Sequence, residues 1–423
     1  MKIKLLIIIL LSGFVLHAQQ IPVVIYNATI HVGNGTIIND GMIVIRNAVI
    51  EYIGPKKELD FNMNDVSSID AAGKQVYPGL IALNSTVGLK EIEAARATND
   101  FYEIGSYNSN VRSLIAFNTD SKVIPTLRTN GVLLAQVVPD AGIIQGQSSV
   151  MKMSGWNWED AVVATDNNMH MHWPSAYRYD YQNQTIVTSN TYSKEVDDIT
   201  TFFNEAKSYG ATKDHAVKNL RFEAMRKVFT GESRLFISAN EAKEIIGAID
   251  FAKSFGLKIV IVGGRESYRV TDLLKENNIP VLLESTHELP GTDDDAVDLP
   301  YRLPALLTNA GILCGLTVCN EGSSYWNVRN LPFEAGTACA YGLTKEQALT
   351  MITMNNAVIA GISGSYGTLE TGKSATLFIC DGDVLDMRTS ELRYIFINGE
   401  RIGIENWQNE LARKFMLKYS IIK

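Results

Sequence analysis

Leu235-Phe236-Ile237-Ser238-Ala239 is a short apolar run, and a helical pattern at residues 240–255 follows it directly. The same order repeats at once, since the apolar run at residues 257–262 precedes a second helical pattern at residues 267–276. Continuous apolar runs that alternate with helices are typical of parallel strands whose sheet is covered on both faces. The pattern therefore predicts an α/β fold in the middle of the chain.

The alternation continues toward the carboxyl end. Further apolar runs and helical patterns occupy residues 280–283, 303–309, 311–318, 333–341 and 345–352. Thr344 precedes the last helical pattern, and Gln347 stands at the spacing of a capping box. A single barrel would use most of a 423-residue chain. The pattern therefore favours a (β/α)8 barrel over an open doubly wound sheet.

Both ends of the chain have the pattern of short strands. Runs rich in Val and Ile, separated by turn residues, occupy residues 23–30, 41–46, 49–53, 375–380 and 394–398. We expect residues 19–75 and 360–405 to form one composite β-sandwich domain. The barrel is expected at residues 76–359, with an aromatic insertion or lid at about 155–232, and a C-terminal helix at residues 406–423.

The first residues have the pattern of a secretory signal. Lys2 and Lys4 precede an unbroken apolar run at residues 5–11, and Leu16-His17-Ala18 offers a cleavage point before Gln19. An uncleaved anchor is the alternative. No Cys follows the run, which excludes lipid attachment there, and no later stretch has the length of a membrane span. We expect a signal peptide at residues 1–18 and an exported, periplasmic protein without a membrane span after cleavage.

Charge and cysteine content narrow the function classes. The formal net charge is −8 and no basic run occurs, which argues against a general nucleic-acid binder. Export permits disulfides, yet the chain has only four Cys. Cys314 and Cys319 share one predicted strand, about 16 Å apart, which is beyond disulfide reach. Free buried thiols are therefore expected, with a catalytic Cys as the alternative.

Four sequence motifs together resemble a known family. They are Val76-Tyr77-Pro78-Gly79-Leu80-Ile81, the run Gly142 to Ser149, Gly342-Leu343-Thr344 with Gln347-Ala348-Leu349, and the run Tyr366 to Leu377. This set resembles the amidohydrolase superfamily, in its imidazolonepropionase-like exported branch. The likeness extends over nearly all of the mature chain. It implies a metal-hydrolase-type (β/α)8 barrel flanked by a small β-sandwich that is built from both chain ends.

The resemblance also implies a metal site. In this superfamily one or two divalent metals at the carboxyl mouth of the barrel activate a water that attacks an amide or imine carbon. The ligands are an H-x-H pair on the first strand, one His each on the fifth and sixth strands, and an Asp on the eighth. The positions that match hold Asn84 and Thr86, Ser238, Gly263, and Cys319 or Asn320.

These residues are poor metal ligands. Zinc prefers imidazole, thiolate or carboxylate groups, whereas Asn, Thr and Ser are neutral oxygen donors and Gly has no side chain. The sequence therefore predicts no bound metal, lost or impaired metal-dependent catalysis, and a retained ligand pocket at the former metal positions.

A remodelled site is the rival interpretation. His287 and Glu284 follow the seventh strand, Glu321 follows the eighth, and His170 and His172 form an H-x-H pair inside the expected insertion. An active C–N hydrolase would require these side chains to converge within about 4 Å of a common point. Packing or surface roles are the alternative for each His. The run Asp293-Asp294-Asp295 could bind Ca²⁺, but a solvated acidic loop is the simpler interpretation.

The sequence thus leaves three functions open. The leading hypothesis is an exported amidohydrolase-family protein that binds a small molecule, as a homo-oligomer or as the partner of an active relative. The rival is the active C–N hydrolase, for which the family implies cyclic amides, imides or small peptides. A purely structural assembly is the third, and it requires an exposed apolar patch.

Overall fold

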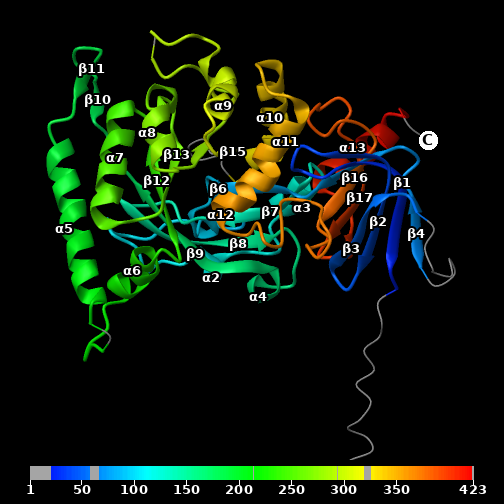
Figure 1. Cartoon of the computed structure of the whole chain (residues 1–423), viewed down its shortest axis with the longest axis horizontal. Helices are drawn as coiled ribbons and strands as arrows, with labels where there is room; N and C mark the ends of the chain where they lie inside the picture. The colour runs from blue at the N-terminus through cyan, green and yellow to red at the C-terminus, as the bar shows by residue number, and fades with distance from the viewer. Residues whose placement is uncertain (1–20, 58–65, 213, 293, 319–324, 422–423) are drawn as a thin grey trace, which may run out of the picture.

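The computed structural model describes residues 21–57, 66–212, 214–292, 294–318 and 325–421. The expected signal peptide lies outside these residues. Two sheets organise the chain: a barrel with its surrounding helices, and a smaller β domain beside it that joins both chain ends (Figure 1). Over the described ranges, no helix has both the length and the apolar character that crossing a bilayer requires.

Eight strands form the barrel sheet, and their order in space follows their order in the chain. They are β6 (Leu80–Ser85), β7 (Val132–Val137), β8 (Ile144–Lys152), β9 (Val162–His172), β12 (Arg234–Ala239), β13 (Ile259–Gly263), β14 (Val281–Leu283) and β15 (Cys314–Leu316). The predicted barrel is confirmed, and the apolar run that opened the sequence argument is its fifth strand.

One strand departs from the regular β/α alternation. β8 pairs antiparallel with both β7 and β9, while all other neighbours in the sheet are parallel. Only residues 138–143 connect β7 to β8. A parallel crossover needs a dozen or more residues, so this short connection can only reverse the chain.

The segment expected as an insertion contributes a barrel strand. β9 lies between β8 and β12 in the sheet, although it falls inside residues 155–232. The remainder of that segment leaves the barrel as the hairpin β10–β11 (Tyr177–Asp180, Thr185–Thr188) and the helices α5 (Tyr192–Gly210) and α6 (Leu220–Thr230). The mixed polarity of β9 hid it from the sequence pattern, because an Asp, two Asn and two His interrupt its apolar residues.

Side-chain hydrogen bonds link the two edges of the barrel sheet. Asn356 begins α12 (Asn356–Ala360), and its Nδ2 donates to Ile81 O of β6 at 2.7 Å and to Leu316 O of β15 at 2.8 Å. Thr317 Oγ1 also donates to Leu83 O. Apolar residues of α12 and of alternate barrel positions form one buried cluster. The barrel interior is therefore packed, as in other β/α barrels.

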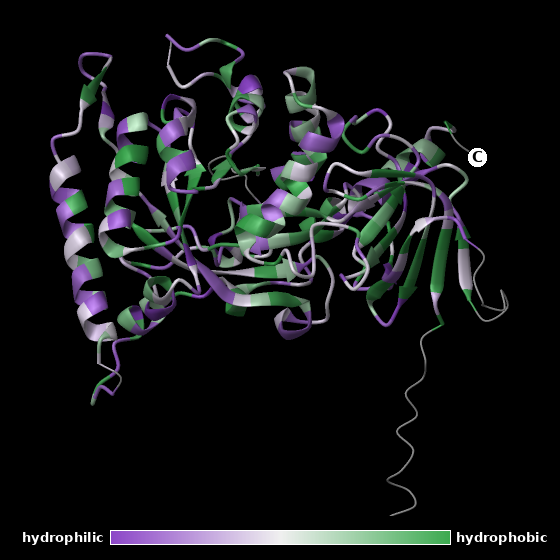
Figure 2. Cartoon of the chain, in the orientation of Figure 1, coloured by the Kyte–Doolittle hydropathy of each residue, from purple (hydrophilic) through white to green (hydrophobic). Residues whose placement is uncertain are grey.

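Amphipathic helices cover the outside of the barrel, as α7 (Ala242–Phe255) illustrates. Glu241 and Glu244 form a capping box at its start, and Gly256 adopts a left-handed φ of 71° after its end. Its buried apolar residues recur at helical spacing, at Ile245, Ala248, Ile249 and Ala252. Figure 2 shows hydrophobic and hydrophilic residues alternating along α7.

Four further helices follow β13 in the predicted order. They are α8 (Thr271–Glu276), α9 (Leu299–Asn309), α10 (Leu331–Ala340) and α11 (Lys345–Thr350). The predicted capping box of Thr344 and Gln347 is present at the start of α11. A π-helical turn, Met351–Asn355, joins α11 to α12.

Both chain ends build the β domain, as predicted. Its hydrogen-bonded order is β18 (Glu400–Ile402), β17 (Leu392–Ile397), β16 (Leu377–Cys380), β5 (Gln75–Pro78), β1 (Val23–His31), β2 (Ile37–Arg46) and β3 (Val49–Pro55), and β4 (Ser67–Asp70) also pairs with β1. Residues from both ends share one buried cluster, so neither end has a complete core alone. Beyond this domain α13 (Trp407–Lys418) buries none of its residues.

Candidate functional site at the barrel mouth

The strand register places several predicted site residues on one rim. His172 of β9 lies opposite Ser238 of β12, and Gly263 of β13 lies opposite Leu283 of β14. Glu284 follows Leu283 directly. Because the carboxyl ends of parallel strands meet at one end of a barrel, these residues surround its mouth.

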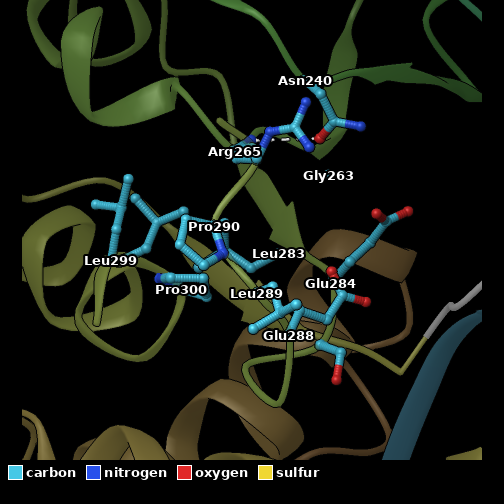
Figure 3. Close-up of a pocket in the computed structure, with 13 residues that line it drawn as sticks. Asn240, Gly263, Arg265, Leu283, Glu284, Glu288, Leu289, Pro290, Leu299 and Pro300 are labelled. Atoms are coloured by element: carbon cyan, nitrogen blue, oxygen red, sulfur yellow. Dashed lines mark hydrogen bonds between the residues drawn. The ribbon is translucent and has the colours of Figure 1, made fainter. Parts of the chain in front are cut away.

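A cavity opens beside this rim, with an empty volume of about 550 Å³ that is partly open to solvent. Its polar lining consists of Asn240, Arg265, Glu284, Ser285 and Glu288, and its apolar lining includes Leu283, Leu299 and Leu303. Figure 3 shows Glu284 and Glu288 on one side of the cavity, and Leu299 with Pro300 on another.

Glu284 is a largely buried carboxyl group whose charge is not compensated. Over the described residues it has no hydrogen bond or ion pair at short range. Its pKa is raised to about 7, mainly by burial and then by the negative charge of Glu288, while His172 and Arg265 oppose the shift. The pKa of Glu288 is raised as well, by burial first and then by Glu334. Both groups are therefore poised to gain from a positive charge in the cavity.

Arg265 lines the cavity, but its guanidinium group is already paired with another carboxyl group. Its Nη2 donates to Glu241 Oε1 at 2.5 Å. Its side chain also lies so close to Gly291 that an added Cβ there would overlap the guanidinium. Its backbone N–H donates to Asn240 Oδ1 at 3.4 Å, the contact that is dashed in Figure 3. Arg265 is therefore a fixed wall of the cavity, already paired outside it.

An Asp–His pair lies at the same mouth. His172 Nε2 and Asp140 Oδ1 are 3.4 Å apart, and Gln145 donates to the same oxygen at 3.0 Å. The hydrogen bond with His172 lowers the pKa of Asp140, although burial opposes this. Both side chains are 48% exposed, so this pair faces solvent at the rim and is not sealed in the core.

His170 lies deeper and has a packing role. It is buried inside the barrel, stacks on Phe236 with ring centroids 4.6 Å apart, and has its Nε2 2.9 Å from Ser148 Oγ. Ser148 in turn accepts from Gln136 Nε2 at 3.2 Å. Burial lowers the pKa of His170 to about 3, so this imidazole is neutral. Of the H-x-H pair, only His172 reaches the mouth.

His287 turns away from Glu284. Its Nε2 contacts Thr337 Oγ1 at 2.5 Å, and its Nδ1 lies 3.3 Å from Glu334 Oε1, both on α10. It lines a different hollow, between α10 and residues 383–387. The structure therefore does not bring His287 and Glu284 to a common point.

The positions that the family resemblance predicts for metal ligands take different roles. Asn84 is half-buried at a bulge in β6, has a φ of 51°, and donates its N–H to Gln136 Oε1 at 3.3 Å. Thr86 is buried, and Ser238 is half-buried with its carbonyl bonded to Trp173 N. Gly263 has a φ of 85°, and Asn240 fills the space that a Cβ would need. Cys319, Asn320 and Glu321 lie outside the described residues.

No metal-binding cluster is present in the parts of the chain that the structure describes, where no three His, Cys, Asp or Glu side chains are grouped suitably. The acidic loop expected near residues 293–295 is only partly described. There Asp294 is exposed, and Asp295 Oδ1 lies 3.9 Å from Arg269 Nη2. The described cysteines, Cys314, Cys339 and Cys380, are free thiols.

Comparison with known proteins places this architecture in a family. Residues 302–412 match the model of the amidohydrolase family. The chain is 23% identical to an imidazolonepropionase of Rhizobium rhizogenes over 382 residues, 82% of this chain and 88% of the relative. An imidazolonepropionase of Agrobacterium fabrum is 24% identical over 388 residues, 84% and 87% of the two chains. The crystal structure of an amidohydrolase from Thermotoga maritima superposes with a TM-score of 0.78 at 25% identity, covering 90% of this chain and 99% of that chain.

The chain belongs to the amidohydrolase superfamily. The divalent metal of that superfamily does not fit the side chains described here. An amide on β6, a hydroxyl directly after β6, a hydroxyl on β12 and a glycine on β13 give neither charge nor imidazole nitrogen. Such a set lacks the imidazole, thiolate or carboxylate groups that zinc requires.

Sequence reasoning missed part of this amidohydrolase mouth. Arg265 and Asn240 line the cavity, Glu288 faces it, and Asp140 pairs with His172. Each lies within five residues after a strand end, which is the rule that selected Glu284. The same rule, applied to every strand, would have found all four.

Proposed function

We propose that this amidohydrolase-superfamily protein has lost metal-dependent hydrolysis and binds a small molecule at its barrel mouth. One observation carries the proposal: the described ligand positions hold Asn, Thr, Ser and Gly, while a cavity with uncompensated carboxyl groups persists beside them. Loss of a group that merely supports a metal ligand lowers affinity or activity by about 10- to 100-fold. Replacement of the imidazole ligands themselves should abolish the site.

Metal content is the direct test. Protein that starts at Gln19 would be purified without chelators, and its zinc and manganese measured by mass spectrometry. We expect far less than one metal per chain. An authentic zinc amidohydrolase, prepared in parallel, is the control that the procedure preserves bound metal. One equivalent of either metal would overturn the proposal.

An active C–N hydrolase is the second candidate, and Glu284 is the observation that favours it. A carboxyl group with a pKa near 7 has the property of a general acid or base, and the His172–Asp140 pair lies at the same mouth. The same purified protein would be assayed with cyclic amides, imides and dipeptides. Turnover that Glu284→Gln abolishes and Glu205→Gln retains would establish this candidate instead.

Export and a partner subunit belong to the same proposal. The charged and apolar pattern of residues 1–18 supports export to the periplasm. Exposed apolar side chains on α13, at Trp407, Phe415 and Leu417, support association with a second copy or with an active relative. Fractionation of expressing cells tests export to the periplasm. Sedimentation of the purified protein tests association with a second subunit.

A further inference from the structure

The mouth cavity combines an acidic wall with an apolar wall. Glu284 and Glu288 supply the acidic wall, and Leu283, Leu299 and Leu303 are buried leucines on the apolar side. We propose that the ligand of this cavity is a small organic amine, bound as its ammonium ion with its hydrocarbon body against the leucines. This inference rests on the proposed function, because it takes the cavity to be the ligand site.

The charge balance of the cavity carries the argument. Its lining holds two carboxyl groups and one guanidinium group, and that guanidinium is already paired with Glu241. A ligand carboxylate would meet two like charges and find Arg265 occupied. A ligand ammonium would meet two acceptors that have no short-range partner among the described residues. Charged hydrogen bonds of this kind are the strong ones in a partly buried site.

The pKa directions agree with that geometry. Burial raises the pKa of Glu284, Glu288 and Glu241, and for each a neighbouring carboxyl group adds to the shift. Arg265 lowers all three but does not cancel the shifts. The site therefore lacks positive charge as it stands, and a bound ammonium would supply it.

A metal cation fits the cavity less well than an amine. Calcium takes six to eight oxygen ligands, and magnesium retains several waters in a strict octahedron. The lining offers two carboxyl groups, an amide and a hydroxyl, and the rest of its wall is largely leucine, proline and glycine. An apolar wall contributes nothing to a metal ion but buries the hydrocarbon part of an amine.

Three probes that share a cyclohexane ring but differ in charge show whether charge or shape determines binding. Cyclohexylamine, cyclohexanol and cyclohexanecarboxylate would be titrated into the full-length mature protein at pH 8 and followed by nuclear magnetic resonance. We expect the amine to bind at least about tenfold more tightly than the alcohol, and the carboxylate to bind least. Glu284→Gln and Glu288→Gln should each weaken amine binding by about tenfold and leave alcohol binding unchanged. Glu205→Gln, on an exposed face of α5, is the matched control.

The pH dependence gives a second measurement. Besides Glu288, the charged groups that act on Glu284 are His172 of β9, Arg265 after β13 and Asp140 after β7. With a pKa of about 7, Glu284 ionises between pH 6 and pH 8, so amine affinity should rise about tenfold over that range. The Glu284→Gln variant lacks this ionising carboxyl group, so its pH profile should be much flatter.

Each outcome decides between the proposals. Equal binding of amine and alcohol, or wild-type amine binding by both Gln variants, would overturn the amine proposal but leave a small-molecule site. Stoichiometric calcium binding that excludes cyclohexylamine would show a metal site instead. If none of the three probes binds, the cavity is not a ligand site, and the proposed function fails with it.

Discussion

Glu284 has an environment that opposes its ionisation. Its carboxyl group is largely buried beside Glu288, and no described cation pairs with it at short range. Such a group costs stability whenever it is charged, and proteins tolerate that cost mainly at functional sites. The same residue therefore connects the stability of the fold with the chemistry of the mouth.

Replacement of Glu284 should stabilise the protein, and more so at high pH. The pKa of Glu284 is raised in the folded state from 4.5 to about 7, so the folded protein retains a proton that the unfolded chain releases. Its unfavourable contribution to stability is therefore absent below pH 4.5, grows as the pH rises from 4.5 to about 7, and is fully present above pH 7. Glu284→Gln should raise the free energy of unfolding by up to about 3 kcal/mol at pH 8, and by less than about 1 kcal/mol at pH 5.

Urea denaturation at the two pH values measures this effect. Glu205→Gln, which removes an exposed carboxyl group on α5, should change stability little at either pH. A Glu284→Gln variant that is less stable than the natural protein at pH 8 would show that the carboxylate has a stabilising partner.

At the scale of elements, α10 holds the loop that follows β14. Glu334 of α10 is 2% exposed, and its Oε2 accepts from Thr286 N at 2.7 Å, from Thr286 Oγ1 at 2.7 Å and from His287 N at 2.9 Å. One buried carboxylate thus accepts hydrogen bonds from two backbone N–H groups of a loop that is not part of the sheet. Because Glu284 and Glu288 lie on either side of Thr286 and His287, this contact shapes the cavity.

Loss of the Glu334 carboxylate should loosen that loop. Glu334→Gln keeps the size of the side chain but removes the charge and replaces one acceptor oxygen by a donor. We expect it to lower the free energy of unfolding by about 1.5–3 kcal/mol, the range for hydrogen bonds to charged groups. It should also weaken binding of cyclohexylamine, because Glu288 would no longer be held in place.

Urea denaturation and the amine titration together check this role. Glu205→Gln again supplies the exposed-carboxyl control. Unchanged stability in Glu334→Gln would mean that the loop is held by other contacts. Lower stability with unchanged amine binding would separate the loop from the cavity.

At the scale of the whole molecule, a half-buried His joins the β domain to the barrel helices. His31 of β1 has its Nδ1 2.6 Å from Glu346 Oε1 of α11 and its Nε2 2.9 Å from Gln75 Oε1, and it stacks on Tyr77. Burial alone would lower the pKa of His31. The hydrogen bonds with Glu346 and Gln75, and the charges of Glu346 and Asp383, outweigh burial and raise it.

The domain junction should therefore weaken as the pH rises. Because the pKa of His31 is raised above 6.5 in the folded state, its contribution to stability is fully present below pH 6.5 and is lost as the pH rises through the folded value. Glu346→Gln should lower the free energy of unfolding by about 1–3 kcal/mol at pH 6, and by clearly less at pH 9.

Unfolding curves at pH 6 and pH 9 test the junction. Glu400→Gln, on the exposed strand β18, removes a carboxyl group of the β domain away from the junction and is the control. An equal loss of stability at both pH values would mean that Glu346 acts without a charged His31.

The sequence by itself determined the architecture, because architecture follows from periodicity and local signals. Apolar strands that alternate with amphipathic helices predicted the barrel, and short strands at both ends predicted the composite β domain. The capping box at Thr344 and Gln347 is present as predicted. Each of these signals depends only on residues that are a few positions apart in the chain, so it can be read directly from the sequence.

Only the tertiary structure decided how the strand ends meet. The reversed direction of β8, the place of β9 inside the barrel and the turn of His287 toward α10 depend on contacts between distant segments. The sequence selected Glu284 and His172 as candidates but could not show that Arg265 is committed to Glu241 or that Glu288 shares the cavity. The net charge of a barrel mouth depends on side chains that follow separate strands. Whether it is positive or negative can therefore be read only from the fold that brings these side chains together.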